Sequence, residues 1–240
     1  TTGAAQLSTS NTTAYTVNVR GNMQVNAGSL SYPNVANNRP QYLVADGDVT
    51  IRSGATLAVA NNTNTAANTL TVSGNITNNG TLDFKPNGSY CDLVFLGEDN
   101  KVINGTTAVR TRLNAITINK GTSRNSVLDV TVNNTNFSLN TALANALTLT
   151  NGTFRLTTNT TINLTTGAFT IPTTGCLSAN GGTINIGTND VDASDLYLNG
   201  RLEVLAGTIN VGSSASTNNH DIEYASAGIP EIFVSGGMLN

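Results

Sequence analysis

The hexapeptide GTINIG at Gly182–Gly187 recurs about 25 residues later as GTINVG at Gly207–Gly212. Between the two copies, apolar and polar side chains alternate, which is the pattern of a strand with one buried face. The apolar positions are Leu196, Leu198, Leu202 and Val204, and the polar ones include Asn199 and Glu203. A repeat of this length, built from strands and turns, is typical of a solenoid, in which each unit buries its apolar face against its neighbours. The sequence therefore predicts stacked β coils.

A glycine separates short strand-like segments at intervals of about 21 to 26 residues, with Ser126 in the equivalent place of one unit. The predicted turn positions are Gly28, Gly54, Gly80, Gly105, Gly152, Gly175 and Gly200. Four of them complete an Asn-Gly pair, which often closes an antiparallel hairpin. A sandwich or barrel of hairpins is therefore the alternative fold. We favour the solenoid, because the self-similarity lies near 25 residues rather than the roughly 8 to 12 of an antiparallel array.

We predict a single all-β solenoid segment over residues 1–240, with parallel strands in about nine coils of roughly 21 to 30 residues. Inward side chains of successive coils are expected to stack, and burial stabilises each by about 1.5–3 kcal/mol. The expected inward pairs are Leu82 and Phe84, Leu128 and Val130, Phe154 and Leu156, and Leu202 and Val204. No helix is predicted, and the alanine-containing stretch Leu139–Leu147 is expected to be a bend.

Charged residues make up only 10% of the chain, against roughly 25% in an average globular domain. Asn and Thr together account for about 31%. Threonine suits strands, and asparagine side chains can hydrogen-bond to one another in successive layers. A net charge of −3 and a pI near 5.0 provide no electrostatic attraction to nucleic acid or to an anionic membrane. We therefore predict no nucleic-acid partner, and the sequence has no apolar run long enough for a transmembrane segment.

The two cysteines, Cys91 and Cys176, occupy different positions relative to the turn glycines of their coils. They are also more than three coils apart in the predicted stack, or roughly 15 Å at the spacing of neighbouring strands. A disulfide requires Cα atoms within about 7 Å of each other. We therefore predict two free thiols.

Few residues have the spacing of a catalytic or metal site. His220 is the only histidine and lies in a polar stretch without a nucleophile motif, so an exposed loop position is expected. Asp190, Asp192 and Asp195 could present carboxylates to Ca²⁺. They lack the bidentate glutamate and the glycine of an EF-hand loop, so a solvated turn is the favoured interpretation and calcium binding is left open.

Asp46 and Asp48 point to the same side of a predicted strand, but no third ligand lies near them in the sequence. The paired carboxylates of glycoside hydrolases lie about 5 to 9.5 Å apart in a cleft, and no acidic residues recur at one position of neighbouring coils. The absence of Trp also removes the usual stacking surface of a carbohydrate-binding groove. We therefore predict a protein that is not an enzyme and uses no cofactor.

The segment CDLVFLGEDNKVINGTTAVRTRLNAITINK, followed by LTLTNGTFRLTTNTTINL, resembles the repetitive adhesin-like extracellular proteins of Bacteroidota, which are type IX secretion substrates. The resemblance extends over about Tyr90 to Val211. It implies a right-handed parallel β-helix, a secreted or cell-surface location, and a role in adhesion, surface coating or gliding. No functional residue is carried over, because the shared positions are structural glycines and inward aliphatic residues.

We expect an extracellular structural and adhesive rod module of a large bacterial surface protein, which mediates attachment or presents binding loops. Its partner would be a surface ligand, either a glycan or another cell-surface protein. The parent chain would continue into further solenoid or a C-terminal sorting domain. The alternative is a polysaccharide-binding or polysaccharide-degrading β-helix, such as the pectate lyases and polygalacturonases, which gather charged residues on one sheet. The sequence shows no such gathering, and the alternative would rely on Asp190, Asp192 and Asp195 beside His220.

Overall fold

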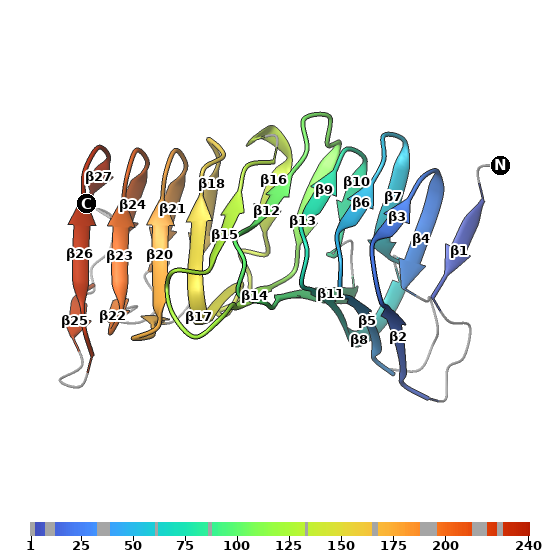
Figure 1. Cartoon of the computed structure of the whole chain (residues 1–240), viewed down its shortest axis with the longest axis horizontal. Helices are drawn as coiled ribbons and strands as arrows, with labels where there is room; N and C mark the ends of the chain where they lie inside the picture. Colours follow the sequence, from blue (N-terminus) through green and yellow to red (C-terminus); the bar gives the residue numbers. More distant parts are fainter. Residues whose placement is uncertain are drawn as a thin grey trace.

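The structure is a computed structural model, which describes residues 3–7, 13–32, 39–60, 62–85, 88–132, 134–164, 168–187, 196–212, 220–224 and 228–240. These residues form a parallel β-solenoid, in which short strands on three sides follow one another and each turn stacks on the preceding turn (Figure 1). The N-terminal and C-terminal turns lie at opposite ends of the long axis. Strands of neighbouring turns pair in parallel, so the antiparallel alternative is wrong for this part of the chain.

The first side of the solenoid is built from two sheets that follow each other along the axis. The first contains β1 (Ala4–Gln6), β4 (Gly28–Tyr32), β7 (Ala55–Val59), β10 (Thr81–Asp83), β13 (Arg110–Leu113) and β16 (Phe137–Leu139). The second contains β18 (Thr161–Leu164), β21 (Thr183–Ile186), β24 (Thr208–Val211) and β27 (Met238–Leu239). Because β16 contacts β18, the second sheet continues the side that the first begins.

The second side has the same arrangement. It begins with β2 (Tyr15–Val19), β5 (Gln41–Ala45), β8 (Asn62–Val72), β11 (Gly88–Phe95), β14 (Ile116–Asn119) and the first half of β17 (Leu147–Leu156). It continues with β19 (Phe169–Ile171), β22 (Leu196–Leu198) and β25 (Ile222–Tyr224). β17 contacts β19, which joins the two parts.

The third side is a sheet that runs the whole length of the solenoid. Its nine strands are β3 (Met23–Val25), β6 (Val49–Ile51), β9 (Ile76–Asn78), β12 (Lys101–Asn104), β15 (Val127–Val130), the second half of β17, β20 (Gly175–Ala179), β23 (Arg201–Val204) and β26 (Glu231–Val234). Within the described chain, β3 and β26 pair on one side only, which leaves seven strands enclosed between neighbours. The solenoid therefore has about seven fully stacked turns, slightly fewer than the nine coils predicted.

Helix is almost absent from the described residues, as the sequence predicted. The only helical segment among them is a single 3-10 turn, Asn134–Asn136. The stretch Leu139–Leu147 forms the bend between β16 and β17. Its alanines do not build a helix, because the ends of the bend are held by strands on two different sides of the solenoid.

The repeated hexapeptides stack on each other in register. Thr183 pairs with Thr208, and the following residues of β21 and β24 pair in the same order. As a result, Asn185 and Asn210 lie directly above one another, and the Asn210 amide donates to the Asn185 side-chain oxygen at 2.7 Å. Asn163 and Asn240 extend this ladder at its two ends. The asparagine ladder expected from the composition is therefore present.

Aliphatic and aromatic side chains fill the interior in columns. Leu128, Phe154, Leu177 and Leu202 occupy matching positions of β15, β17, β20 and β23, and all four are fully buried. The predicted inward residues are all buried: Leu82, Phe84, Leu128, Val130, Phe154, Leu156, Leu202 and Val204. At about 1.5–3 kcal/mol per buried side chain, these columns supply the main stabilisation of a fold without helices.

The predicted turn glycines lie at two different corners. Those from Gly28 to Gly105 lie at the beginning of, or shortly before, strands of the first side: β4, β7, β10 and β13. Those from Gly152 to Gly200 lie at the beginning of strands of the third side. The Asn151-Gly152 pair does not close a hairpin, because β17 continues through it, pairing with β14 before the bend and with β15 after it. Gly152 has a φ of 91°, which allows this bend.

Side-chain oxygens at another corner cap backbone amides of the next turn. The Asn22 Oδ1 accepts from the Asp48 N–H at 2.9 Å, and the Asp48 Oδ1 accepts from the Asn75 N–H at 2.7 Å. The Asn75 Oδ1 then accepts from the Val102 N–H at 3.0 Å. The corner that precedes β3, β6, β9 and β12 is thus held by side chains in three successive steps.

Replacing Gly105 by alanine is expected to lower the free energy of unfolding by about 2 kcal/mol or more. Gly105 has a φ of 146°, and an added Cβ would lie only 1.7 Å from the carbonyl oxygen of Asn78 in the turn below. Urea titration followed by circular dichroism measures the change. Gly21→Ala is the matched control, because nothing lies within 4 Å of its added Cβ. Equal stability of the two variants would contradict the stacking of this corner.

Candidate functional site

The structure differs from the expected exposed position of His220. This residue is half-buried and packs against Gly212, where an added Cβ would lie 2.9 Å from the Cβ of His220. Asp190, Asp192 and Asp195 lie outside the described residues. The solvated turn therefore stays a prediction, and calcium binding by these residues stays open. Within the described ranges, no group of three His, Cys, Asp or Glu residues lies close enough together to hold a metal ion.

Asp46 and Asp48 have separate surroundings. Asp46 is exposed, whereas Asp48 uses its Oδ1 to accept from both the backbone and the side-chain amide of Asn75, at 2.7 and 3.1 Å. Asp48 therefore has a structural role in holding a corner.

A network of charged residues covers the outer face of the third side, where the sequence indicated no gathering of charges. The residues are Arg124, Arg155, Arg201, Glu203 and Glu231, from the segment before β15 and from β17, β23 and β26. They lie more than 100 residues apart at the extremes, but the stacking brings them to one surface. The expectation that no charges gather on one sheet is therefore wrong.

The network alternates in sign along its length. Arg124 lies 2.9 Å from Glu231, which is 3.6 Å from Arg201. Arg201 lies 2.9 Å from Glu203, which is 3.7 Å from Arg155. The guanidinium of Arg201 also lies over the ring of Phe233, 4.6 Å from its centroid. Each glutamate thus lies within ion-pair distance of two arginines, and the network joins several turns. We call it the charge clamp.

Side chains that point outward from a strand are normally exposed to water, but the clamp buries some of them. Glu203 is only 8% exposed, and its Oε2 accepts from the Ser178 hydroxyl at 2.7 Å. Cys176 lies beneath the clamp, and burial, with the charge of Glu203 acting in the same direction, raises the pKa of its thiol to about 12. Cys91 is buried on β11, and burial also raises the pKa of its thiol. Both thiols are free and are protonated at neutral pH.

Lys120 is a buried cation with a structural role. Its ammonium donates to the backbone carbonyl of Asp99 at 2.8 Å and to those of Leu96 and Gly97 at 3.4 Å. Burial lowers the pKa of Lys120 to about 8, with the charge of Lys101 acting in the same direction. The ammonium thereby closes the bend between β11 and β12.

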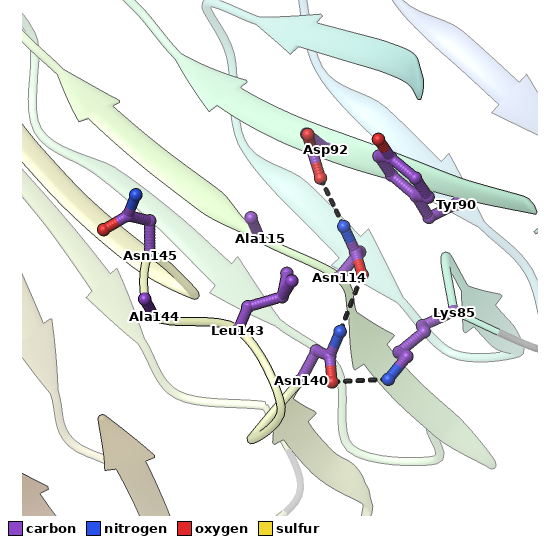
Figure 2. Close-up of a pocket in the computed structure, with 9 residues that line it drawn as sticks. All are labelled: Lys85, Tyr90, Asp92, Asn114, Ala115, Asn140, Leu143, Ala144 and Asn145. Atoms are coloured by element: carbon purple, nitrogen blue, oxygen red, sulfur yellow. Dashed lines mark hydrogen bonds between the residues drawn. The ribbon is translucent and has the colours of Figure 1, made fainter. Parts of the chain in front are cut away.

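A groove of about 490 Å³ lies at the corner between the first and second sides. Strand β11 and the segments that precede β14 and β17 line it. Figure 2 shows Tyr90 and Lys85 on one side and the bend that carries Leu143, Ala144 and Asn145 on the other. The floor between them carries Asp92, Asn114 and Asn140. A concave surface of this volume, with apolar walls and a few polar groups, has the general form of a ligand site.

The polar groups of the groove form one continuous line of hydrogen bonds. The Asn114 amide donates to the Asp92 carboxylate at 2.7 Å, and the Asn140 amide donates to the Asn114 oxygen at 2.9 Å. The Lys85 ammonium donates to the Asn140 oxygen and so reaches across the intervening turn. Asn114 and Asn140 are buried, so the line fixes their orientation. We call these four residues the groove ladder.

Asp92 is a titratable group of the groove, and its pKa lies above the usual value of an aspartate. Burial raises its pKa, and the hydrogen bonds from the Asn114 amide and the Ala115 backbone oppose this shift in part. The ionised form of Asp92 therefore lowers the stability of the folded state at neutral pH.

The spacing of polar residues in the sequence could have indicated the groove ladder, although the ladder matches no known motif. Asp92, Asn114 and Asn140 are separated by 22 and 26 residues, which is the spacing of the repeat. Polar residues that recur at the repeat period outside the turn glycines point to a polar column on the surface. Lys85 lies 29 residues before Asn114, which is the offset at which β10 pairs with β13, so it belongs to the same column. Tyr90 falls outside this spacing, and only the folded corner brings it to the groove.

Comparison with protein-family models, with curated proteins and with solved structures found no match for this chain. In the part of the chain that the structure describes, no helix is long and apolar enough to cross a membrane.

Replacing Glu203 by glutamine is expected to lower the free energy of unfolding by about 2 kcal/mol, because Arg155 and Arg201 lose their shared counter-charge at a largely buried position. The variant keeps the shape of the side chain and an acceptor for Ser178. Chemical denaturation measures the change, with the exposed Glu98→Gln as the matched control. A loss no greater than that of the control would show that the clamp does not stabilise the stack.

Replacing Asp92 by asparagine is expected to raise the melting temperature at pH 7. Because the folded-state pKa of Asp92 is raised, the native state binds its proton more readily than the unfolded state, and this contribution to stability is lost as pH rises through the folded pKa. The advantage of D92N should therefore shrink as pH falls towards 3. Asp46→Asn, at an exposed aspartate, is the control. A D92N advantage that is the same at pH 3 and pH 7 would contradict this account.

Proposed function

We propose that this chain is a rigid structural and adhesive rod module of an extracellular bacterial surface protein, in which the rod holds ligand-binding groups away from the cell. The observation that carries the proposal is the third side, whose nine strands pair in succession from one end of the solenoid to the other. From β3 to β26 there are eight steps of about 4.7–4.9 Å, which gives a rod of roughly 38 Å. The resemblance of its central segment to adhesin-like proteins of Bacteroidota supports the same assignment.

Stiffness follows from the way in which the turns are joined. Each turn is connected to the next by backbone hydrogen bonds on three sides and by the buried columns, so bending the axis would break many contacts at once. The asparagine ladder and the charge clamp add side-chain links between the same turns. Such a stack suits a spacer that must transmit force.

The last turn leaves apolar side chains exposed that earlier turns bury. Ile232 and Val234 on β26 are 40% and 47% exposed, whereas Leu202 and Val204, which pair with them on β23, are fully buried. An exposed strand edge of this kind is a template for pairing with another strand. The proposal therefore includes a further parallel β layer that covers β26 in the parent protein.

Beads that carry the purified chain are expected to attach to a biological surface in a saturable manner. The test measures their retention on epithelial cells, on mucin and on immobilised polysaccharide, with excess soluble chain as competitor. Beads that carry an Ile118→Asp variant are the control, because a carboxylate at this fully buried position disrupts the core. Retention equal to that of the control on all three surfaces would overturn the adhesive function.

The groove favours a second candidate function, which is polysaccharide binding. Its ladder of amide, carboxylate and ammonium groups beside a tyrosine ring offers the contacts that a sugar chain uses. The two functions are compatible, since a rod can carry the groove on its flank.

A further inference from the structure

We propose that the groove formed by Lys85, Tyr90, Asp92, Asn114 and Asn140 binds an uncharged, hydroxyl-rich saccharide chain. This inference rests on the proposed function, because it names the ligand class and the site through which the rod would attach.

The groove ladder is preorganised for hydroxyl groups. Its hydrogen bonds hold both buried amides in place, so a ligand would not have to order them. An ammonium carries three donors, an amide nitrogen two, and a carboxylate several acceptor sites, which is more than the ladder itself uses. Neighbouring hydroxyls of a sugar both donate and accept, and therefore match such a mixed row.

The walls of the groove suit the apolar faces of sugar rings. Tyr90 is half-buried on β11, and Leu143 and Ala144 face it from the opposite bend (Figure 2). An aromatic ring opposite aliphatic side chains can contact the C–H faces of a sugar ring while the ladder contacts its hydroxyls. The ladder spans three successive turns, or about 10 Å at the spacing of neighbouring strands. The groove therefore accommodates a short stretch of a chain.

Charge and backbone pairing exclude two other ligand classes. The groove holds one ammonium, that of Lys85, and one carboxylate, that of Asp92, so it has no excess positive charge to attract an acidic polysaccharide. An extended peptide usually binds by adding a strand to an open sheet edge. At the groove, β11 pairs with β8 and β14, and β14 pairs with β11 and β17, so no such edge is available.

Isothermal titration calorimetry with soluble hexasaccharides tests the proposal. The probes are cellohexaose, chitohexaose, mannohexaose and laminarihexaose, with hexagalacturonate as the acidic probe and tetra-alanine as the peptide probe. We expect saturable binding of at least one neutral hexasaccharide to the wild-type chain. Tyr90→Ala and Lys85→Met should each weaken it at least tenfold, which corresponds to about 1.4 kcal/mol. Tyr197→Ala, at an exposed tyrosine on β22 outside the groove, should leave the affinity unchanged.

Melting temperatures of the variants show whether each one folds, and a variant that fails to fold is replaced by the milder Tyr90→Leu or Lys85→Gln. The proposal is overturned if no neutral hexasaccharide binds at concentrations up to about 10 mM, or if only hexagalacturonate or tetra-alanine binds. It is also overturned if Tyr90 and Lys85 variants bind as well as the wild type. If no hexasaccharide binds but the beads still attach, the groove is not the binding site and the adhesive function stands. If a hexasaccharide binds but the beads do not attach, the groove is a saccharide site and the adhesive function is rejected.

Discussion

Parallel backbone hydrogen bonding in register between successive turns is the interaction on which the rest of this structure depends. It places each residue directly above its counterpart about one repeat earlier, as Asn185 and Asn210 show. Columns of like side chains follow from this placement. Where the column is apolar it becomes core, as for Leu128 and Phe154, and where it is asparagine it becomes a ladder of amide hydrogen bonds.

The same stacking makes the surface a product of distant parts of the chain. The charge clamp joins Arg124 to Glu231, and the groove ladder joins Lys85 to Asn140, although neither pair is close in sequence. Lys85 reaches over one intervening turn, whereas three strands, β17, β20 and β23, lie between Arg124 and Glu231. A solenoid can therefore build functional surfaces on its flank without any insertion, which is how we interpret the groove. Its position on the flank leaves the ends of the rod available for further stacking.

The two surfaces differ in what their charges do. In the charge clamp, arginines and glutamates alternate, and Glu203 is buried beneath its partners. That arrangement links the turns of the stack. In the groove, one carboxylate and one ammonium stand at separate ends of a row of amides, and burial raises the pKa of Asp92.

The sequence by itself determined the parallel β-solenoid, because the 25-residue period and the alternation of apolar residues leave few other ways to bury Leu202 and Val204. It also predicted the columns and the asparagine ladder, since both depend on residues one repeat apart. Tertiary structure alone decided the number of fully stacked turns, the two corners at which the turn glycines lie, and the gathering of Arg124, Arg155 and Arg201 on one sheet. It also decided the groove. The physical reason is that a repeat fixes which residues stack, whereas the length of each bend and the reach of each long side chain fix which residues of different columns meet.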